Sequence, residues 1–88
     1  IIAEEGCVIE FGDYNIIEEN VLIRAVPKFN TLLNNISPVE IIIGNYNHIK
    51  VGCKLENTSM IDNNILEYYV ESEDCSIESN VLITSNVK

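Results

Sequence analysis

Large apolar residues recur every six positions along much of the chain. A spacing of six fits neither the 3.6-residue period of a helix nor the strict alternation of a hairpin strand. It is typical of a short strand followed by a corner, with one large side chain per strand pointing inward. Three such sides close a triangular coil of about 18 residues, and stacked coils form a parallel β-helix. The predicted inward residues are Phe11, Ile17, Ile23, Ile43, Ile49, Leu55, Met60, Leu66, Ile77 and Ile83.

Internal repetition supports the same interpretation. Residues 43–53 repeat residues 11–21, with Gly, Asn or Asp, Tyr and Asn in the same order, and residues 61–67 are a weaker copy. Residues 18–23 return in similar form at 78–83. A step of five rather than six between Leu55 and Met60 indicates one tightened corner. Repeats of this kind are expected to stack, because a single coil cannot bury its inward face alone.

A second inward position lies two residues before each large one. Most residues there are small or β-branched, and Asn15, Asn47 and Asn64 share the register, which predicts an asparagine ladder. Asn also tolerates the left-handed backbone that a tight corner needs. The alternative is that Asn is simply frequent, with twelve in 88 residues. The full series is Ile9, Asn15, Val21, Asn47, Cys53, Asn64, Cys75 and Val81.

The six-residue period is interrupted twice. Residues 24–40 contain both prolines and show no period, which predicts a loop inserted at a corner, because proline cannot donate to a central ladder. Leu32, Leu33 and Ile36 within this loop either pack back on the coil or mark a contact with a partner. The second interruption follows Leu66, where Val70 or Glu71 is expected to take the inward place.

Composition limits the class of protein. The 88 residues predict a single β-helix domain, residues 1–88, which starts with Ile rather than Met and is therefore expected to be a fragment whose coil is incomplete at both ends. No apolar run reaches the length of a membrane span, and no signal peptide is seen. A net charge of −9 argues against binding to nucleic acid or anionic membranes.

The pattern of the three cysteines indicates the redox compartment of the protein. Cys7, Cys53 and Cys75 are odd in number, widely spaced and without a C-x-x-C pair, so neither a disulfide framework nor a zinc site is expected. A reducing, cytoplasmic compartment follows from that pattern.

Several segments carry a resemblance to a known family. They are residues 1–4 (Ile-Ile-Ala-Glu), 15–19 (Asn-Ile-Ile-Glu-Glu), the proline-containing loop, 42–44, 51–53 (Val-Gly-Cys) and 62–67. Together they resemble the hexapeptide-repeat proteins, which fold as left-handed β-helices, and within them the β-helix subunits of dynactin. Left-handed coils are an exception to the right-handed crossover rule. Members of this family are longer at both ends.

This resemblance implies a function. The chain would be a non-catalytic structural subunit of the dynactin pointed-end complex, in a hetero-oligomer with dynactin subunit 5, the p62 subunit and the actin-related subunit at the pointed end. It would be cytoplasmic and associated with the cytoskeleton. The complex would support cargo and adaptor engagement for dynein-driven microtubule transport. No cofactor is implied.

The same superfamily contains enzymes, which gives an alternative. Its γ-carbonic-anhydrase-like members bind zinc through three histidines from neighbouring coils, and its acyltransferases use a histidine base. This chain has only His48, in the outward place held by Ile16 and Ile65 in other copies. His48 is interpreted as a surface residue, with a catalytic role as the alternative. We therefore expect no catalytic, cofactor-binding or metal residues unless a partner supplies them.

Three tyrosines are the candidate binding residues. Tyr14, Tyr46 and Tyr68 are expected to point outward, the first two in the same register. An aromatic ladder on a flat β-face is a plausible partner surface. Cross-strand packing alone is the alternative explanation.

Overall fold

The computed structural model describes residues 1–84, and in this range it contains fourteen short strands. Twelve of them form three parallel sheets, the sides of a prism. Side A consists of β1 (Ile2–Ala3), β4 (Leu22–Ala25), β9 (Lys54–Glu56) and β12 (Glu71–Glu73). Side B consists of β2 (Val8–Phe11), β7 (Glu40–Ile43), β10 (Ser59–Met60) and β13 (Ser76–Ile77). Side C consists of β3 (Ile16–Ile17), β8 (His48–Ile49), β11 (Ile65–Leu66) and β14 (Leu82–Ile83).

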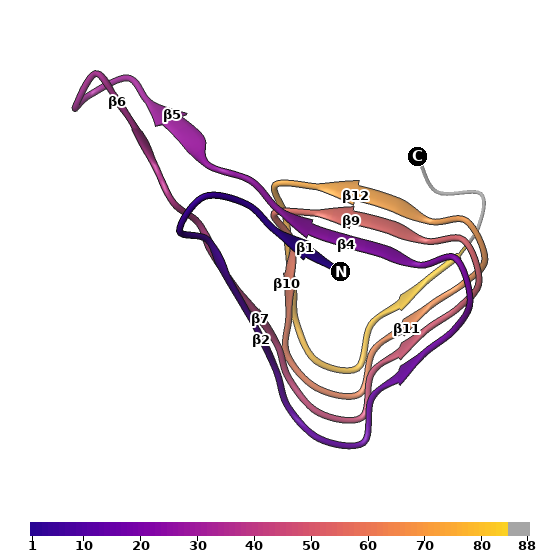
Figure 1. The fold of residues 1–88 in the computed structure, drawn as a ribbon. Coiled ribbons are helices and arrows are strands. Elements are labelled where there is room, and N and C mark those ends of the chain that lie inside the picture. The colour runs from indigo at the N-terminus through magenta and orange to yellow at the C-terminus, as the bar shows by residue number, and fades with distance from the viewer. Residues whose placement is uncertain (85–88) are drawn as a thin grey trace.

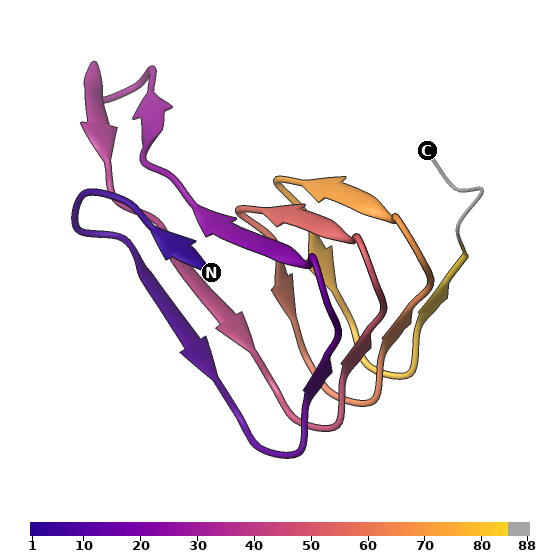
Figure 2. The same ribbon diagram turned by 45° about the vertical axis from the view of Figure 1, so that its right-hand side comes forward.

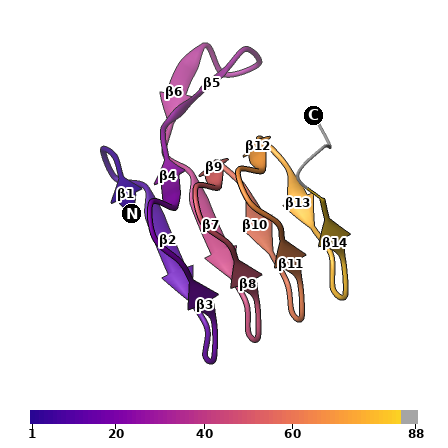
Figure 3. The same ribbon diagram turned by 90° about the vertical axis from the view of Figure 1, so that its right-hand side faces the viewer.

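The coil is triangular and left-handed. Seen along its axis, the chain turns counterclockwise from side B through side C to side A (Figure 1). The side views show that the coils recede from the viewer of Figure 1 as the chain advances from β1 to β14 (Figures 2 and 3). A counterclockwise path that recedes is a left-handed helix. The predicted all-β, left-handed parallel β-helix with one inserted loop is therefore confirmed. Within residues 1–84, no helix is long and apolar enough to span a membrane.

The coils that follow the inserted hairpin are 17 residues long, one fewer than the predicted value of about 18. Met60 pairs with Ile43 and with Ile77, and hydrogen bonds between equivalent residues of neighbouring coils span 17 positions. The missing residue is at the corner from side A to side B. The short step from Leu55 to Met60 recurs after Ser72, which pairs with Leu55. The tightened corner is thus a regular part of the repeat, not a single irregularity.

The prism interior contains most of the predicted inward residues. Ile23, Ile43, Ile49, Leu55, Met60, Leu66 and Ile77 are buried, whereas Ile17 and Ile83 are partly buried and pack against that core. Phe11 was predicted to be buried, but 38% of its surface is exposed. Phe11 takes the inward position, because it pairs with Ile43 of β7. Its strand, β2, is the outermost strand of side B in the described residues, so Phe11 is inward without being fully buried.

The second interruption of the period is a change of residue type and not of register. Val70 is buried in line with Cys53, while Glu71 is exposed on the outward face. The large inward position goes to Ser72, which neither expectation named. Its hydroxyl lies 3.1 Å from that of the buried Thr58, so the polar pair is satisfied inside the prism.

Most corners have one residue in the left-handed backbone conformation, directly before the small inward residue, whereas the first corner from side A to side B has positive φ at both Glu5 and Gly6. A chain that turns sharply between two strands requires this conformation, which Gly and Asn adopt at low cost. Tyrosine adopts it rarely. The corner from side B to side C has Tyr14, Tyr46, Asn63 and Asn80, the corner from C to A has Asn20, Gly52 and Tyr69, and the corner from A to B has Gly6, Asn57 and Asp74.

The inserted loop is a β-hairpin. Strands β5 (Lys28–Asn30) and β6 (Asn35–Ser37) pair antiparallel and project from the corner between sides A and B, at the upper left of Figure 1. Because β4 ends at Ala25 and β7 begins at Glu40, the insertion comprises residues 26–39 rather than 24–40. The choice that the sequence left open is also resolved. Leu32, Leu33 and Ile36 do not pack back on the coil, because they are 94%, 66% and 68% exposed.

Candidate protein-binding surface

Asn15, Asn47 and Asn64 form one column along the inside of side C. The Oδ1 atom of each accepts a hydrogen bond from a backbone N–H one coil further on, at Asn47 (2.9 Å), Asn64 (3.0 Å) and Val81 (2.8 Å). The Nδ2 groups of Asn15 and Asn47 each donate to a backbone carbonyl of the next coil at 2.8 Å. The side chains thus join coil to coil through the backbone. The predicted asparagine ladder is thus a column of side-chain bonds to the backbone.

A second polar column stabilises the same corner, and sequence reasoning missed it. The backbone N–H of Asp13 donates to Asn45 Oδ1 at 2.7 Å, that of Asn45 to Asp62 Oδ1 at 2.7 Å, and that of Asp62 to Ser79 Oγ at 3.3 Å. The sequence does contain a signal for this second column, namely a short polar residue two positions before each member of the asparagine column. The two columns connect successive coils in opposite senses, so they fix the stacking at the corner where the tyrosines lie.

Tyr14 and Tyr46 stack on the outside of this corner. Their ring centroids are 5.0 Å apart and the rings are 11° from parallel, while 75% and 58% of their surfaces remain exposed. In the next two coils, Asn63 and Asn80 occupy the corner position of Tyr14 and Tyr46, so the aromatic stack contains only these two tyrosines. Tyr68 is at the next corner, where the centroid of its ring lies 5.3 Å from Lys50 Nζ. Tyr68 therefore does not join the stack of Tyr14 and Tyr46, and a partner surface that includes all three tyrosines stays a prediction.

The outward face of side C continues from the tyrosine corner. Ile16, His48, Ile65 and Leu82 lie in line across its four strands, and the three aliphatic residues are 56%, 41% and 57% exposed. His48 Nε2 lies 2.5 Å from Glu18 Oε2. The hydrogen bond from His48 lowers the pKa of the Glu18 carboxyl. His48 is thus an outward residue on this face, paired with one carboxylate.

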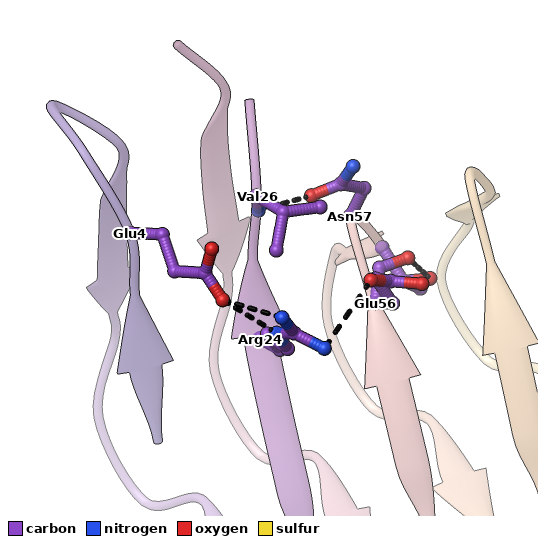
Figure 4. Close-up of polar contacts among 6 residues, drawn as sticks. Glu4, Arg24, Val26, Glu56 and Asn57 are labelled. Atoms are coloured by element: carbon purple, nitrogen blue, oxygen red, sulfur yellow. Dashed lines mark hydrogen bonds and ion pairs between the residues drawn. The ribbon is translucent and has the colours of Figure 1, made fainter. Parts of the chain in front are cut away.

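Side A presents charged side chains instead. Arg24 lies between two acidic residues of neighbouring coils, with its Nη2 atom 2.5 Å from Glu4 Oε2 and its Nη1 atom 3.9 Å from Glu56 Oε1 (Figure 4). The hydrogen bond that the guanidinium donates to Glu4 raises the pKa of Arg24. A shallow groove crosses this side, with Lys54 and Glu71 among its lining residues. Exposed ion pairs of this kind add little to the stability of the fold, so they define the character of the face more than its stability.

Metal-binding groups and the Cys53 thiol are the remaining candidates for chemistry among the described residues. Among residues 1–84, no group of three or more His, Cys, Asp and Glu side chains is placed to hold a metal ion. The Cys53 thiol is buried, donates to the carbonyl of Glu67 at 2.9 Å, and has a pKa raised by that burial. A thiol in such an environment is a poor nucleophile.

The chain was compared with known proteins, and it is similar to a dynactin subunit. No protein-family model matches the chain, and no solved structure matches it. Dynactin subunit 6 of Xenopus tropicalis is 35% identical over 86 residues, which are 97% of this chain and 40% of the relative. The chain thus spans about two fifths of the length of that protein. The matched residues include all three sides of the prism and the inserted hairpin. We conclude that this chain is a relative of dynactin subunit 6.

Proposed function

We propose that the chain is a non-catalytic structural subunit of the dynactin pointed-end complex. The observation that carries this proposal is the 35% identity to dynactin subunit 6, which extends over 97% of the chain. Fold alone would not support a function, because the same architecture carries unrelated activities. The proposed partners are dynactin subunit 5, the p62 subunit and the actin-related subunit at the pointed end. The proposed location is the cytoplasm, in association with the cytoskeleton.

The structure suggests how such a subunit would work. Every coil is tied to the next by parallel backbone ladders and by the two polar columns at the corner between sides B and C. A prism connected in this way keeps its faces fixed relative to one another, so contacts made on one side are held in a defined geometry relative to contacts on another. In the complex it would scaffold dynactin and support cargo and adaptor engagement for dynein-driven transport.

The tyrosine corner is the proposed contact for one of these partners. Tyr14 and Tyr46 offer a stacked, exposed aromatic surface, and the exposed Ile16 and Ile65 extend it onto side C. Aromatic residues with a polar tip are enriched at protein interfaces because they bury much apolar area and still satisfy a hydrogen bond. Tyr46→Ser should therefore weaken assembly. Tyr69→Ser is the matched control, because Tyr69 is 69% exposed and has the same backbone conformation at a different corner.

Reconstitution tests the proposal. The full chain would be co-expressed with the other pointed-end subunits in place of dynactin subunit 6, and the products would be separated by size-exclusion chromatography and identified by mass spectrometry. We expect one stoichiometric complex that contains the chain. Failure to assemble, with a folded chain eluting alone, would contradict the proposal. Metal analysis of the same sample tests the enzymatic alternative, since stoichiometric zinc would contradict a purely structural role.

A further inference from the structure

The hairpin of residues 26–39 exposes an apolar surface that the prism does not cover. Phe29 and Ile36 pair across strands β5 and β6 and are 59% and 68% exposed. Leu32 and Leu33 form the tip and are 94% and 66% exposed. A contiguous group of large apolar side chains on a projecting element is characteristic of an interaction site, whereas single exposed apolar residues are ordinary. The hairpin is therefore the strongest candidate for a contact outside the prism faces.

The hairpin is held in place before any partner arrives. Lys28 Nζ lies 3.1 Å from Oδ1 of Asp74, which follows β12. The backbone N–H of Val26 donates to Asn57 Oδ1 at 2.8 Å. At the tip, Asn30 Oδ1 accepts hydrogen bonds from the two leucine amides, at 3.0 and 3.2 Å. An isolated two-stranded hairpin is marginal in water. These contacts order this one, so binding would lose less conformational entropy.

The charge distribution identifies the kind of partner. Residues 26–39 contain none of the fourteen acidic residues of the chain and a single lysine, which is already paired. Acidic residues instead surround the base of the hairpin: Glu40 begins β7 directly after it, and Glu5 lies in the adjoining turn between β1 and β2, both exposed. A second copy of the chain would bring the same carboxylates against these, which disfavours self-pairing.

We propose that the hairpin is a docking arm that inserts Leu32 and Leu33 into an apolar groove of a partner protein, with Lys or Arg side chains on the rim of that groove facing Glu5 and Glu40. The apolar tip supplies affinity, and the carboxylates at the base supply orientation and association rate. The identity of the partner rests on the function proposed above. The chemistry of the groove follows from the hairpin itself.

The test measures binding of the full chain to the pointed-end complex assembled without dynactin subunit 6, by biolayer interferometry. We expect Leu32→Ser/Leu33→Ser to raise the dissociation constant about tenfold to a hundredfold, as for central interface residues. Tyr69→Ser is the control, because Tyr69 is 69% exposed at the corner between sides C and A, away from the hairpin, and should leave binding unchanged. Circular dichroism should show that the leucine variant melts like the parent, since both side chains are exposed.

A second variant tests the rim. Glu5→Gln/Glu40→Gln should lower the association rate about tenfold at low ionic strength, and the difference from the parent should shrink as salt screens the charges. Equal binding by parent and leucine variant would overturn the docking arm and leave the proposed function intact. Absence of binding by the parent would overturn the proposed function and, with it, this partner. A concentration-dependent dimer of the chain that the leucine variant abolishes would show that a second copy occupies the arm, which also contradicts the proposal.

Discussion

Asn47 offers the sharpest test of how the coils are held together. Its side chain is 1% exposed, accepts a hydrogen bond from the N–H of Asn64 at 3.0 Å and donates to the carbonyl of Ile61 at 2.8 Å. Asn47→Ala removes both bonds and leaves two backbone groups unpaired inside the prism. An unsatisfied buried polar group costs about 1–3 kcal/mol, so the variant should lose about 2–6 kcal/mol of unfolding free energy. That is a large part of the roughly 5–15 kcal/mol of a typical domain.

Asn15→Ala is the matched comparison. Asn15 makes the same two kinds of bond, to the N–H of Asn47 at 2.9 Å and to a carbonyl at 2.8 Å, but it is only partly buried on the first coil. Water can replace the lost partners there, so the cost should fall to about 1 kcal/mol, the net contribution of an ordinary hydrogen bond. The two variants therefore differ in burial and not in bonding pattern.

Urea unfolding followed by far-ultraviolet circular dichroism measures both costs, with the free energy extrapolated linearly to zero denaturant. We expect the Asn47 variant to be the less stable by about 1 kcal/mol or more. An Asn47→Ala chain within about 1 kcal/mol of the parent would refute the view that the column satisfies otherwise orphaned backbone groups. Equal losses for the two variants would show that burial does not set the cost.

Three further predictions concern other parts of the prism. Gly44→Ala should destabilise the chain by about 3 kcal/mol or more, measured in the same urea assay, because the added Cβ would collide with a backbone carbonyl of the next coil. The lowered pKa of Glu18 means that its pairing with His48 stabilises the fold above the ordinary carboxyl pKa of 4.5 and that this stability is lost as pH falls through the folded-state pKa. Urea midpoints from about pH 7 down to 3 should therefore fall less steeply in Glu18→Gln, and parallel curves would contradict the pairing. In the native chain, the exposed Cys75 should react with iodoacetamide long before the buried Cys53, as mass spectrometry of briefly treated protein would show, and equal rates would contradict the described core.

Much of the fold could be predicted because a β-helix is assembled from local units. Each side is a strand of a few residues and a corner, so the six-residue step from Ile43 to Ile49 already contains the structural rule. The same rule places Asn47 inward and His48 outward, as the structure has them. Ser72 was missed because a polar residue in a large inward position removes the hydrophobic signal on which the pattern depends.

The binding surface was less predictable. Tyr14 and Tyr46 share a register that the repeat reveals, and they stack. Tyr68 is outward as well, but it lies 22 residues after Tyr46, whereas the coil repeats after 17. The residue equivalent to Tyr46 is therefore Asn63, and Tyr68 lies at the following corner. The hairpin was not predicted for another reason. Its two short antiparallel strands lie between Pro27 and Pro38, and a segment bounded by prolines without the six-residue period indicates a loop.

By itself, the sequence determined the architecture: a stack of parallel three-sided coils with aliphatic residues inside, asparagines at one corner and one insertion. It could do so because these features repeat, and each repeat needs only its neighbours. Tertiary structure alone decided which inward residues are truly buried, as Phe11 and Ile23 show with 38% and 0% exposure. It also decided that the leucines of the hairpin face outward. Burial is a property of what lies on the other side of a residue, and no local pattern contains that information.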